Sequence, residues 1–178
     1  MSMEKIDLWL PDVAKNWVGD WVKPRMSGIE LGCGCSTLWL AERVKHLVSI
    51  EGNETWYKRI SELLVSRGVE NVELIYAEPN KRYLAVLKGL EDGAFDFAFS
   101  DGPGALRSQC IIQAWPKVKV GGALIADDTQ APHSMMGRRF LEKQGVKRQT
   151  LRGPGTNPWN GRRNERGWET SVWIRRDD

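Results

Sequence analysis

The sequence has 178 residues, of which 41% are hydrophobic and 28% charged, and its formal net charge is +3. A chain of this length can build one well-packed core but is too short for two ordinary domains. No apolar run approaches the roughly 18 residues that a membrane-spanning helix needs, and the acidic, proline-containing N-terminus lacks the pattern of a signal peptide. We therefore expect one cytoplasmic domain over residues 1–178.

Short β-type runs alternate with helical patterns along the chain, which is typical of a parallel α/β sheet. An amphipathic helix is predicted first, because Val13, Trp17 and Trp21 share one face that either packs on the core or roofs a ligand cleft. The predicted strands cover residues 28–31, 46–50, 72–76, 95–100, 123–126, 146–151 and 170–175. Further helices are predicted over residues 37–45, 54–67, 82–90, 107–117 and 132–144.

The sequence also predicts the ends of one helix and the position of a long loop. Asn53 and Gly68 flank the helix predicted over 54–67 as its N-cap and its C-terminal stop. Residues 153–168, rich in glycine, arginine and tryptophan, are predicted to form a long loop, and such loops in compact domains are commonly functional or mobile.

The three cysteines do not form a recognisable framework. Cys33 and Cys35 are too close for an ordinary disulfide and lack zinc-site spacing, and Cys110 leaves an odd count. We expect all three thiols to be reduced and structural.

Residues 30–36 read ELGCGCS, with Glu30, Gly32, Gly34 and Ser36 at alternate positions after a short apolar run. A dinucleotide-binding turn needs a third glycine, but that position holds Thr37. The pattern of an acid followed by glycine at alternate positions resembles the first motif of class I S-adenosylmethionine (SAM) dependent methyltransferases. The resemblance implies that these four residues form part of a SAM site.

The same resemblance extends over about residues 28–175 and implies further cofactor contacts. Glu51 follows the second predicted strand, where the family's acid binds the ribose hydroxyls. Ala77 and Glu78 follow the third strand, where the family contacts adenine, and Asp101 follows the fourth. The implied fold is a doubly wound, Rossmann-like α/β sheet of order 3-2-1-4-5-7-6 with strand seven antiparallel, preceded by a helical extension over residues 1–27.

Three carboxylates follow neighbouring predicted strands. Asp101 ends the fourth strand, and Asp127 and Asp128 end the fifth, so their oxygens can reach one hard cation such as Mg²⁺. The arrangement resembles metal-dependent O-methyltransferases of the catechol and macrocin types, in which Mg²⁺ would activate an acceptor hydroxyl. Two alternatives stay open: Asp128 caps the following helix, or Asp101 accepts a cofactor or backbone hydrogen bond.

The acceptor is less well specified. His133 offers a general base in place of the metal, and Asp101 and Asp127 are the other catalytic candidates. Residues 101–104 read DGPG and lack the aromatic residue with which nucleic-acid amino-methyltransferases stack a base, so a nucleic-acid substrate is disfavoured. Side chains of the 153–168 segment suit an acidic or aromatic small molecule, and these are Trp159, Arg162, Arg163, Arg166 and Trp168.

The sequence therefore predicts a SAM-dependent methyltransferase that acts on a hydroxyl group of a small molecule, with Mg²⁺ assistance left open. Methylation of protein or RNA, a non-catalytic SAM-binding role and a nicotinamide-dependent oxidoreductase remain as alternatives. The oligomeric state is not predicted.

Overall fold

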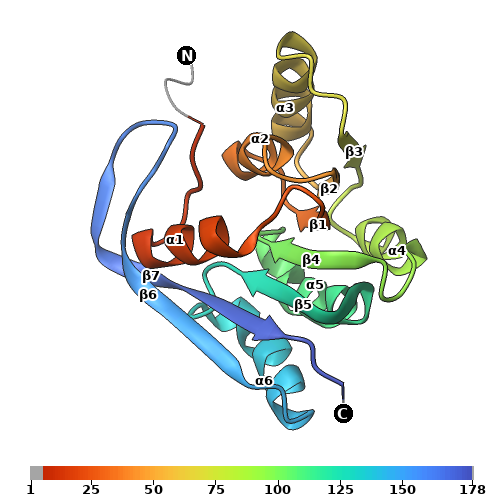
Figure 1. The fold of residues 1–178 in the computed structure, drawn as a ribbon, viewed down its shortest axis with the longest axis vertical. Helices are drawn as coiled ribbons and strands as arrows, with labels where there is room; N and C mark the ends of the chain where they lie inside the picture. Colours follow the sequence, from red (N-terminus) through yellow and green to blue (C-terminus); the bar gives the residue numbers. More distant parts are fainter. Residues whose placement is uncertain (1–5, 178) are drawn as a thin grey trace.

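A computed structural model describes residues 6–177 and contains one seven-stranded sheet in a single α/β domain (Figure 1). The strand order is β3-β2-β1-β4-β5-β7-β6. Strands β1 to β5 pair in parallel, and β7 runs antiparallel to both β5 and β6. The predicted fold, including the order and the antiparallel seventh strand, is confirmed.

The elements alternate along the chain as the sequence patterns predict. The strands are β1 Ser27–Leu31, β2 His46–Glu51, β3 Val72–Tyr76, β4 Phe95–Ser100, β5 Val118–Ala126, β6 Arg148–Thr156 and β7 Arg163–Ile174. The α-helices are α1 Asp12–Trp21, α2 Cys35–Ala41, α3 Glu54–Ser66, α4 Lys81–Gly89, α5 Arg107–Ala114 and α6 Met135–Lys143. Within the described residues, no helix is both long and apolar enough to cross a bilayer.

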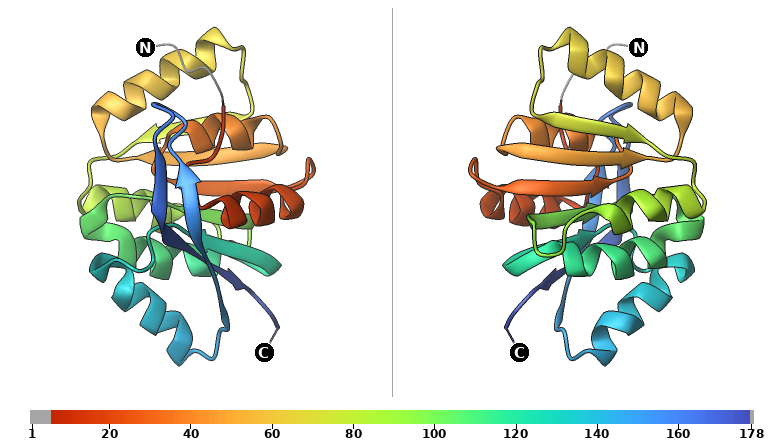
Figure 2. Two further views of the ribbon diagram at one scale, coloured as in Figure 1. Left: turned by 90° about the vertical axis from the view of Figure 1, so that its left-hand side faces the viewer. Right: turned by 90° about the vertical axis from the view of Figure 1, so that its right-hand side faces the viewer.

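The sheet is covered on both faces, which explains the continuous apolar runs of its central strands (Figure 2). One core cluster joins the sheet to α4, α5 and α6 through buried side chains such as Tyr83, Ile111 and Leu141. A second cluster joins the other face to α1 and α2 through Val18 and Leu40. Because strands β1 to β5 are parallel, their carboxyl ends lie along one edge of the sheet.

Helix α1 packs against the core rather than roofing a cleft, but its buried stripe is shifted by one residue from the predicted one. Ala14 and Val18 are buried, whereas Val13 is 43% exposed. Trp17 and Trp21 flank the stripe and stack on each other with ring centroids 5.6 Å apart. The tryptophans mark the correct side of the helix, and Ala14 and Val18 are its buried residues.

Helix α3 begins and ends near the residues that its predicted N-cap, Asn53, and its C-terminal glycine, Gly68, indicate. The Asn53 side chain accepts a hydrogen bond from the Trp56 backbone N–H at 3.1 Å, and Gly68 has a φ of 64°. Within the described residues, no disulfide joins Cys33, Cys35 or Cys110, and their reduced state stays a prediction.

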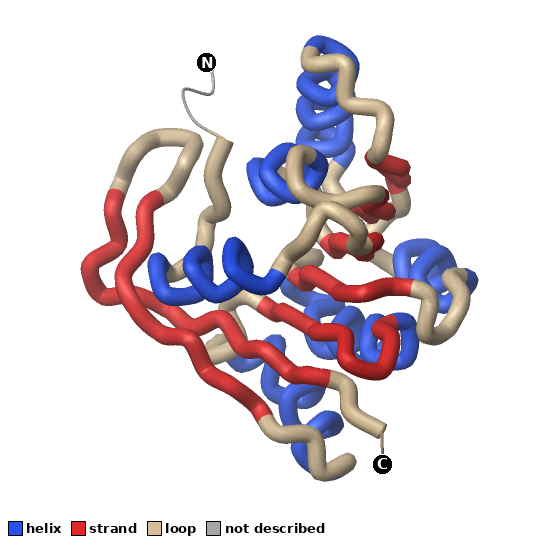
Figure 3. The backbone as a smooth tube through the Cα atoms, viewed as in Figure 1, coloured by secondary structure: helices blue, strands red, loops and turns tan. Residues whose placement is uncertain are grey.

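The prediction of a long loop over residues 153–168 is wrong. Strands β6 and β7 continue through this segment as a long hairpin, and only residues 157–162 connect them (Figure 3). Glycines that indicate a loop here permit a bulged, closely paired hairpin instead. A Cβ on Gly155 would lie 2.5 Å from the Leu10 carbonyl oxygen, and Gly167 has a φ of 69°.

Candidate active site

The glycine turn after β1 approaches the end of β4 so closely that only glycine fits. Gly32 has a φ of 92°, and a Cβ there would lie 2.6 Å from the Asp101 carbonyl oxygen. Gly34 has open space around its Cα and precedes helix α2. The turn therefore exposes backbone at the carboxyl edge of the sheet.

Glu30 holds this turn from below. Its side chain is fully buried, and its carboxylate accepts hydrogen bonds from the hydroxyls of Ser36 at 2.5 Å and of Thr37 and Ser49 at 2.6 Å. The Thr37 hydroxyl in turn accepts a bond from the Gly34 N–H at 2.9 Å. Burial raises the pKa of Glu30 to about 7, although the three hydroxyls oppose the shift.

A cavity of about 430 Å³ opens above the glycine turn. Its floor and walls come from the carboxyl ends of β1, β2 and β4 and from the loops that follow them. Five of the predicted cofactor-binding residues line it, and these are Gly32, Gly34, Ser36, Glu51 and Asp101. Glu30, Ala77 and Glu78, also predicted to contact the cofactor, are not among the lining residues.

Glu51 is held rigidly in this cavity. Its two carboxylate oxygens accept hydrogen bonds from the backbone N–H groups of Cys33 at 2.6 Å and Asn53 at 2.5 Å. These bonds join the glycine turn to the start of α3. An oriented carboxylate with remaining lone pairs is suited to accept hydrogen bonds from a pair of hydroxyl groups.

Aromatic side chains close the cavity from above. Trp159, at the tip of the β6–β7 hairpin, meets Trp56 at the start of α3 with ring centroids 5.1 Å apart. The Arg59 guanidinium lies 4.0 Å from the Trp159 ring centroid. Trp9, which is 50% exposed, lies on the rim. The hairpin thus crosses from the far edge of the sheet to cover the first cavity.

A second cavity of about 610 Å³ adjoins the first and shares Trp9 and Asp101 with it. Charged residues at the ends of β4 and β5 line one side, and polar residues of the β6–β7 hairpin line the other. The hairpin residues are Asn157, Asn160, Arg162, Arg163, Asn164, Gly167 and Trp168. Two compartments that meet at one carboxylate are suited to bring a cofactor and a polar acceptor together.

The three predicted carboxylates do lie together in the second cavity. One oxygen from each of Asp101, Asp127 and Asp128 lies within 4.8 Å of the others. Asp128 has a φ of 52°, a left-handed conformation that aspartate tolerates better than most residues. Its carboxylate accepts a bond from the Gln130 side-chain amide at 3.1 Å and does not cap helix α6.

The environments of Asp101 and Asp127 differ. Asp127 is buried, and its carboxylate accepts hydrogen bonds from the Thr170 hydroxyl at 2.6 Å and the Trp168 indole N–H at 3.0 Å. Burial raises the pKa of Asp127 well above its ordinary value, and the neighbouring Asp101 charge adds to the shift. The Asp101 side chain is 43% exposed, and its partial desolvation raises its pKa to about 6, while the Arg107 charge opposes this shift.

Arg107 holds the cluster together. Its guanidinium donates to Asp101 Oδ1 at 2.5 Å and lies 3.5 Å from Asp128 Oδ2. It also donates to the backbone carbonyls of Gly102 at 3.2 Å and Asp127 at 3.0 Å. Since Asp127 is occupied by β7 donors and the other two carboxylates face a guanidinium, the donor set as arranged does not fit Mg²⁺.

His133, the alternative base, is exposed in a short 3₁₀ turn before α6 and lines neither cavity. The Ser108 hydroxyl donates to its backbone carbonyl at 2.6 Å, so the contact with the site region involves main chain rather than imidazole. The structure therefore gives this side chain no position from which to reach either compartment directly.

Several lining residues carried no signal in the sequence. Trp9 and Trp56 fall within ordinary helix and coil patterns, and Arg107 is one arginine at the start of a predicted helix. From the sequence, Trp168 is predicted as a substrate contact on a loop, whereas its indole N–H donates to Asp127 from strand β7. The basic content of residues 153–168 was the one available indication that this segment belongs to the site.

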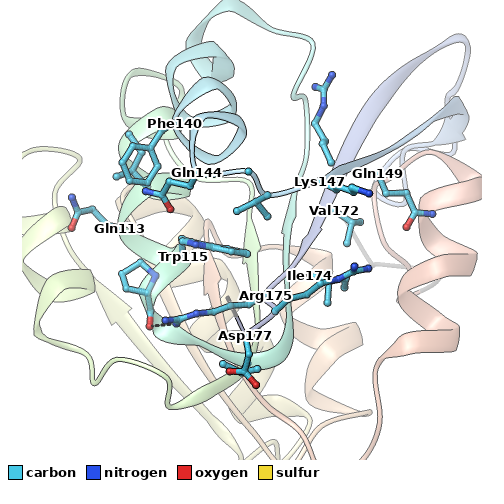
Figure 4. Close-up of a pocket in the computed structure, with 17 residues that line it drawn as sticks. Gln113, Trp115, Phe140, Gln144, Lys147, Gln149, Val172, Ile174, Arg175 and Asp177 are labelled. Carbon is cyan, nitrogen blue, oxygen red and sulfur yellow. Dashed lines mark hydrogen bonds between the residues drawn. The ribbon is translucent and has the colours of Figure 1, made fainter.

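A third and larger cavity, of about 910 Å³, lies near the amino end of β5 between α5, α6 and the end of β7 (Figure 4). Trp115, Phe140 and Ile174 line it together with Arg175. It shares no lining residue with the other two cavities and contains none of the predicted site residues.

Several solved structures with a similar fold are described as methyltransferases. A Klebsiella pneumoniae protein described as a putative O-methyltransferase has a TM-score of 0.67 and 21% identity, covering 85% of this chain and 74% of that one. TomG of Streptomyces achromogenes, an O-methyltransferase of tomaymycin synthesis solved with SAM, has a TM-score of 0.66 and 20% identity over 85% and 74% of the two chains. A SAM-dependent O-methyltransferase from Thermotoga maritima has a TM-score of 0.69 and 17% identity over 99% and 69%.

At these identities the structural likeness establishes the fold, and no curated protein sequence matches the chain significantly. A sequence-family model described as a methyltransferase domain matches residues 29–129, which contain the glycine turn, Glu51 and all three clustered aspartates. Because that match covers more than half of a chain with the Rossmann-like seven-stranded sheet, the protein belongs to this methyltransferase family.

Proposed function

We propose that this chain is a SAM-dependent methyltransferase that methylates a hydroxyl group of a polar small molecule. The observation that carries the proposal is the pair of adjoining cavities that meet at Asp101. The first cavity has the glycine turn and an oriented carboxylate, and the second is lined mostly by charged and polar side chains. A cofactor in the first cavity and an acceptor in the second would lie next to each other at Asp101.

In the first cavity, Glu51 binds the ribose hydroxyls, since its oxygens are already oriented by two backbone N–H groups. Gly32 and Gly34 let the cofactor's amino-acid portion approach the backbone closely. Trp56 and Trp159 exclude water from above. Glu30 acts indirectly by holding Ser36 and Thr37 of the turn, and Ala77 and Glu78 remain candidates for adenine contact.

When bound, SAM would supply a methyl group activated by its positively charged sulfur. The acceptor oxygen would bond to the methyl carbon as the carbon–sulfur bond breaks, and S-adenosylhomocysteine would be the leaving group. Asp101, at the boundary between the cavities, accepts the proton of the acceptor hydroxyl. Its raised pKa, about 6, is closer to that of an effective base at neutral pH than an ordinary aspartate would be. Asp127, buried against β7, accepts hydrogen bonds from Thr170 and Trp168 and so keeps Trp168 in place as a wall of the acceptor cavity.

Magnesium assistance, which the sequence left open, is not part of this mechanism because Arg107 already contacts two of the three carboxylates. His133 is likewise replaced by Asp101 as the proposed base. The assignment of residues 1–27 as an extension and 28–175 as the core, and the cytoplasmic location, are retained as predictions from the sequence.

Two measurements test the proposal. Calorimetry should show S-adenosylhomocysteine binding that weakens at least about tenfold in Glu51→Gln, because one oriented charged acceptor is lost. Radiolabelled SAM should then transfer its methyl group to a member of a panel of hydroxylated small molecules, and Asp101→Asn should abolish transfer while keeping cofactor affinity. Preferential binding of NADH, or methylation of protein or RNA only, would contradict the proposal.

A further inference from the structure

We propose that the Arg107 guanidinium is the resident cation of the Asp101, Asp127 and Asp128 cluster, so that this acceptor site works without a bound divalent metal. The consequence for methyl transfer rests on the proposed function, but the occupancy of the cluster does not. Arg107 would be a positioning residue that acts through Asp101.

The contacts of Arg107 span the ends of two strands. Its three guanidinium nitrogens reach Asp101, Gly102, Asp127 and Asp128, using one carboxylate and one carbonyl after β4 and one of each after β5. The side chain is only 12% exposed. A planar guanidinium with several fixed donors is suited to such a set of acceptors, whereas an ammonium group is not.

Several of the oxygens that a metal would need already have donors, although Asp101 Oδ2 has none among the described residues. Asp127 accepts from Thr170 Oγ1 at 2.6 Å and from Trp168 Nε1 at 3.0 and 3.1 Å, so both of its oxygens have donors. Asp101 Oδ1 faces Arg107. Recruiting the Asp127 oxygens to a cation would break hydrogen bonds of a buried carboxylate, where lost bonds are costly.

Charge leads to the same inference. A divalent ion within reach of all three aspartates would lie beside the Arg107 guanidinium, and two cations a few ångströms apart repel strongly in a partly buried site. The other arginines that line the cavity are placed differently. Arg163 pairs with Asp12 and Glu165 on the hairpin side, and the described contacts of Arg162 include none of the three aspartates.

The arrangement also orients the proposed base. Arg107 takes Asp101 Oδ1, and among the described residues no hydrogen bond is made by Oδ2. The second oxygen is thus the one available to an acceptor hydroxyl at the boundary of the two cavities. In this role the guanidinium offsets part of the negative charge of the cluster and leaves Asp101 Oδ2 as the oxygen that accepts the proton.

The test measures Mn²⁺ binding by electron paramagnetic resonance, which needs no acceptor and no activity. The full chain, with and without S-adenosylhomocysteine, is compared with Arg107→Met, which keeps the length of the stem and removes the charge. Arg162→Met is the matched control, because it removes a cation from the same cavity without opening the cluster. We expect no specific Mn²⁺ site in the wild type or the control, and a gain in affinity of about tenfold or more in Arg107→Met.

Specific Mn²⁺ binding by the wild type that is lost in Asp101→Asn would overturn the proposal, even if Arg107→Met failed to fold. An equal gain in Arg107→Met and Arg162→Met would also overturn it, because general electrostatics would then suffice. S-adenosylhomocysteine calorimetry on the same samples separates the two proposals: absent nucleoside binding counts against the proposed function, and metal binding counts against the resident cation.

Discussion

The Glu30 carboxyl group should make the stability of this protein fall as pH rises through neutrality. It is fully buried beneath the glycine turn, and burial raises its pKa from an ordinary value of 4.5 to about 7. Between these two pH values the folded protein binds a proton that the unfolded chain has already released. The contribution of Glu30 to stability is therefore complete below pH 4.5 and is lost as pH rises through about 7.

The magnitude follows from the two pKa values. At about 1.4 kcal/mol per pH unit, the interval from 4.5 to about 7 corresponds to roughly 3 kcal/mol of unfolding free energy. The Glu30→Gln variant has no proton to release here. Its amide can still accept from two hydroxyls and donate to the third, because the Ser36, Thr37 and Ser49 hydroxyls can each accept as well as donate.

Urea unfolding at pH 5 and pH 8 measures this effect. The stability of Glu30→Gln relative to the wild type should improve by about 2–3 kcal/mol between the two pH values. Asp101 and Asp127 also have raised pKa values, but they are present in both proteins and cancel in the difference. Glu78→Gln is the control, since that side chain is 54% exposed and should leave the slope unchanged. An identical pH dependence in wild type and Glu30→Gln would refute the argument.

Three further outcomes are expected. Gly32→Ala should destabilise the fold by about 1–3 kcal/mol or more in thermal unfolding, because its φ is 92° and the new Cβ would meet the Asp101 carbonyl, whereas Gly34→Ala has open space and should cost much less. Trp159→Ala should weaken S-adenosylhomocysteine binding in calorimetry by about tenfold because an aromatic side chain that lines the cavity is lost, and unchanged affinity would contradict a role of Trp159 in cofactor binding. Thr170→Val should lower the urea midpoint by an amount equivalent to about 1–3 kcal/mol, since it removes the shortest hydrogen bond to the buried Asp127, and an unchanged midpoint would count against that bond.

The sequence by itself determined the parallel sheet, its strand order through a family resemblance, and the positions of the glycine turn and Glu51. These features are local: they depend on apolar periodicity, on the Asn53 cap, and on a glycine at a turn that no other residue can adopt. The carboxylates also came together as predicted, because parallel strands end at one edge of the sheet.

Only the tertiary structure decided what surrounds those groups. The hairpin that looked like a loop places Trp159 on Trp56 and Trp168 on Asp127, and α5 directs Arg107 across to the end of β5. Each of these contacts joins segments far apart in the chain, and the two hairpin contacts also depend on the register of β6 and β7 and on the irregularity between Gly153 and Gly155, which the sequence does not reveal. The sequence positions of the three aspartates suggest a metal site, whereas the structure shows the Arg107 guanidinium in contact with two of them.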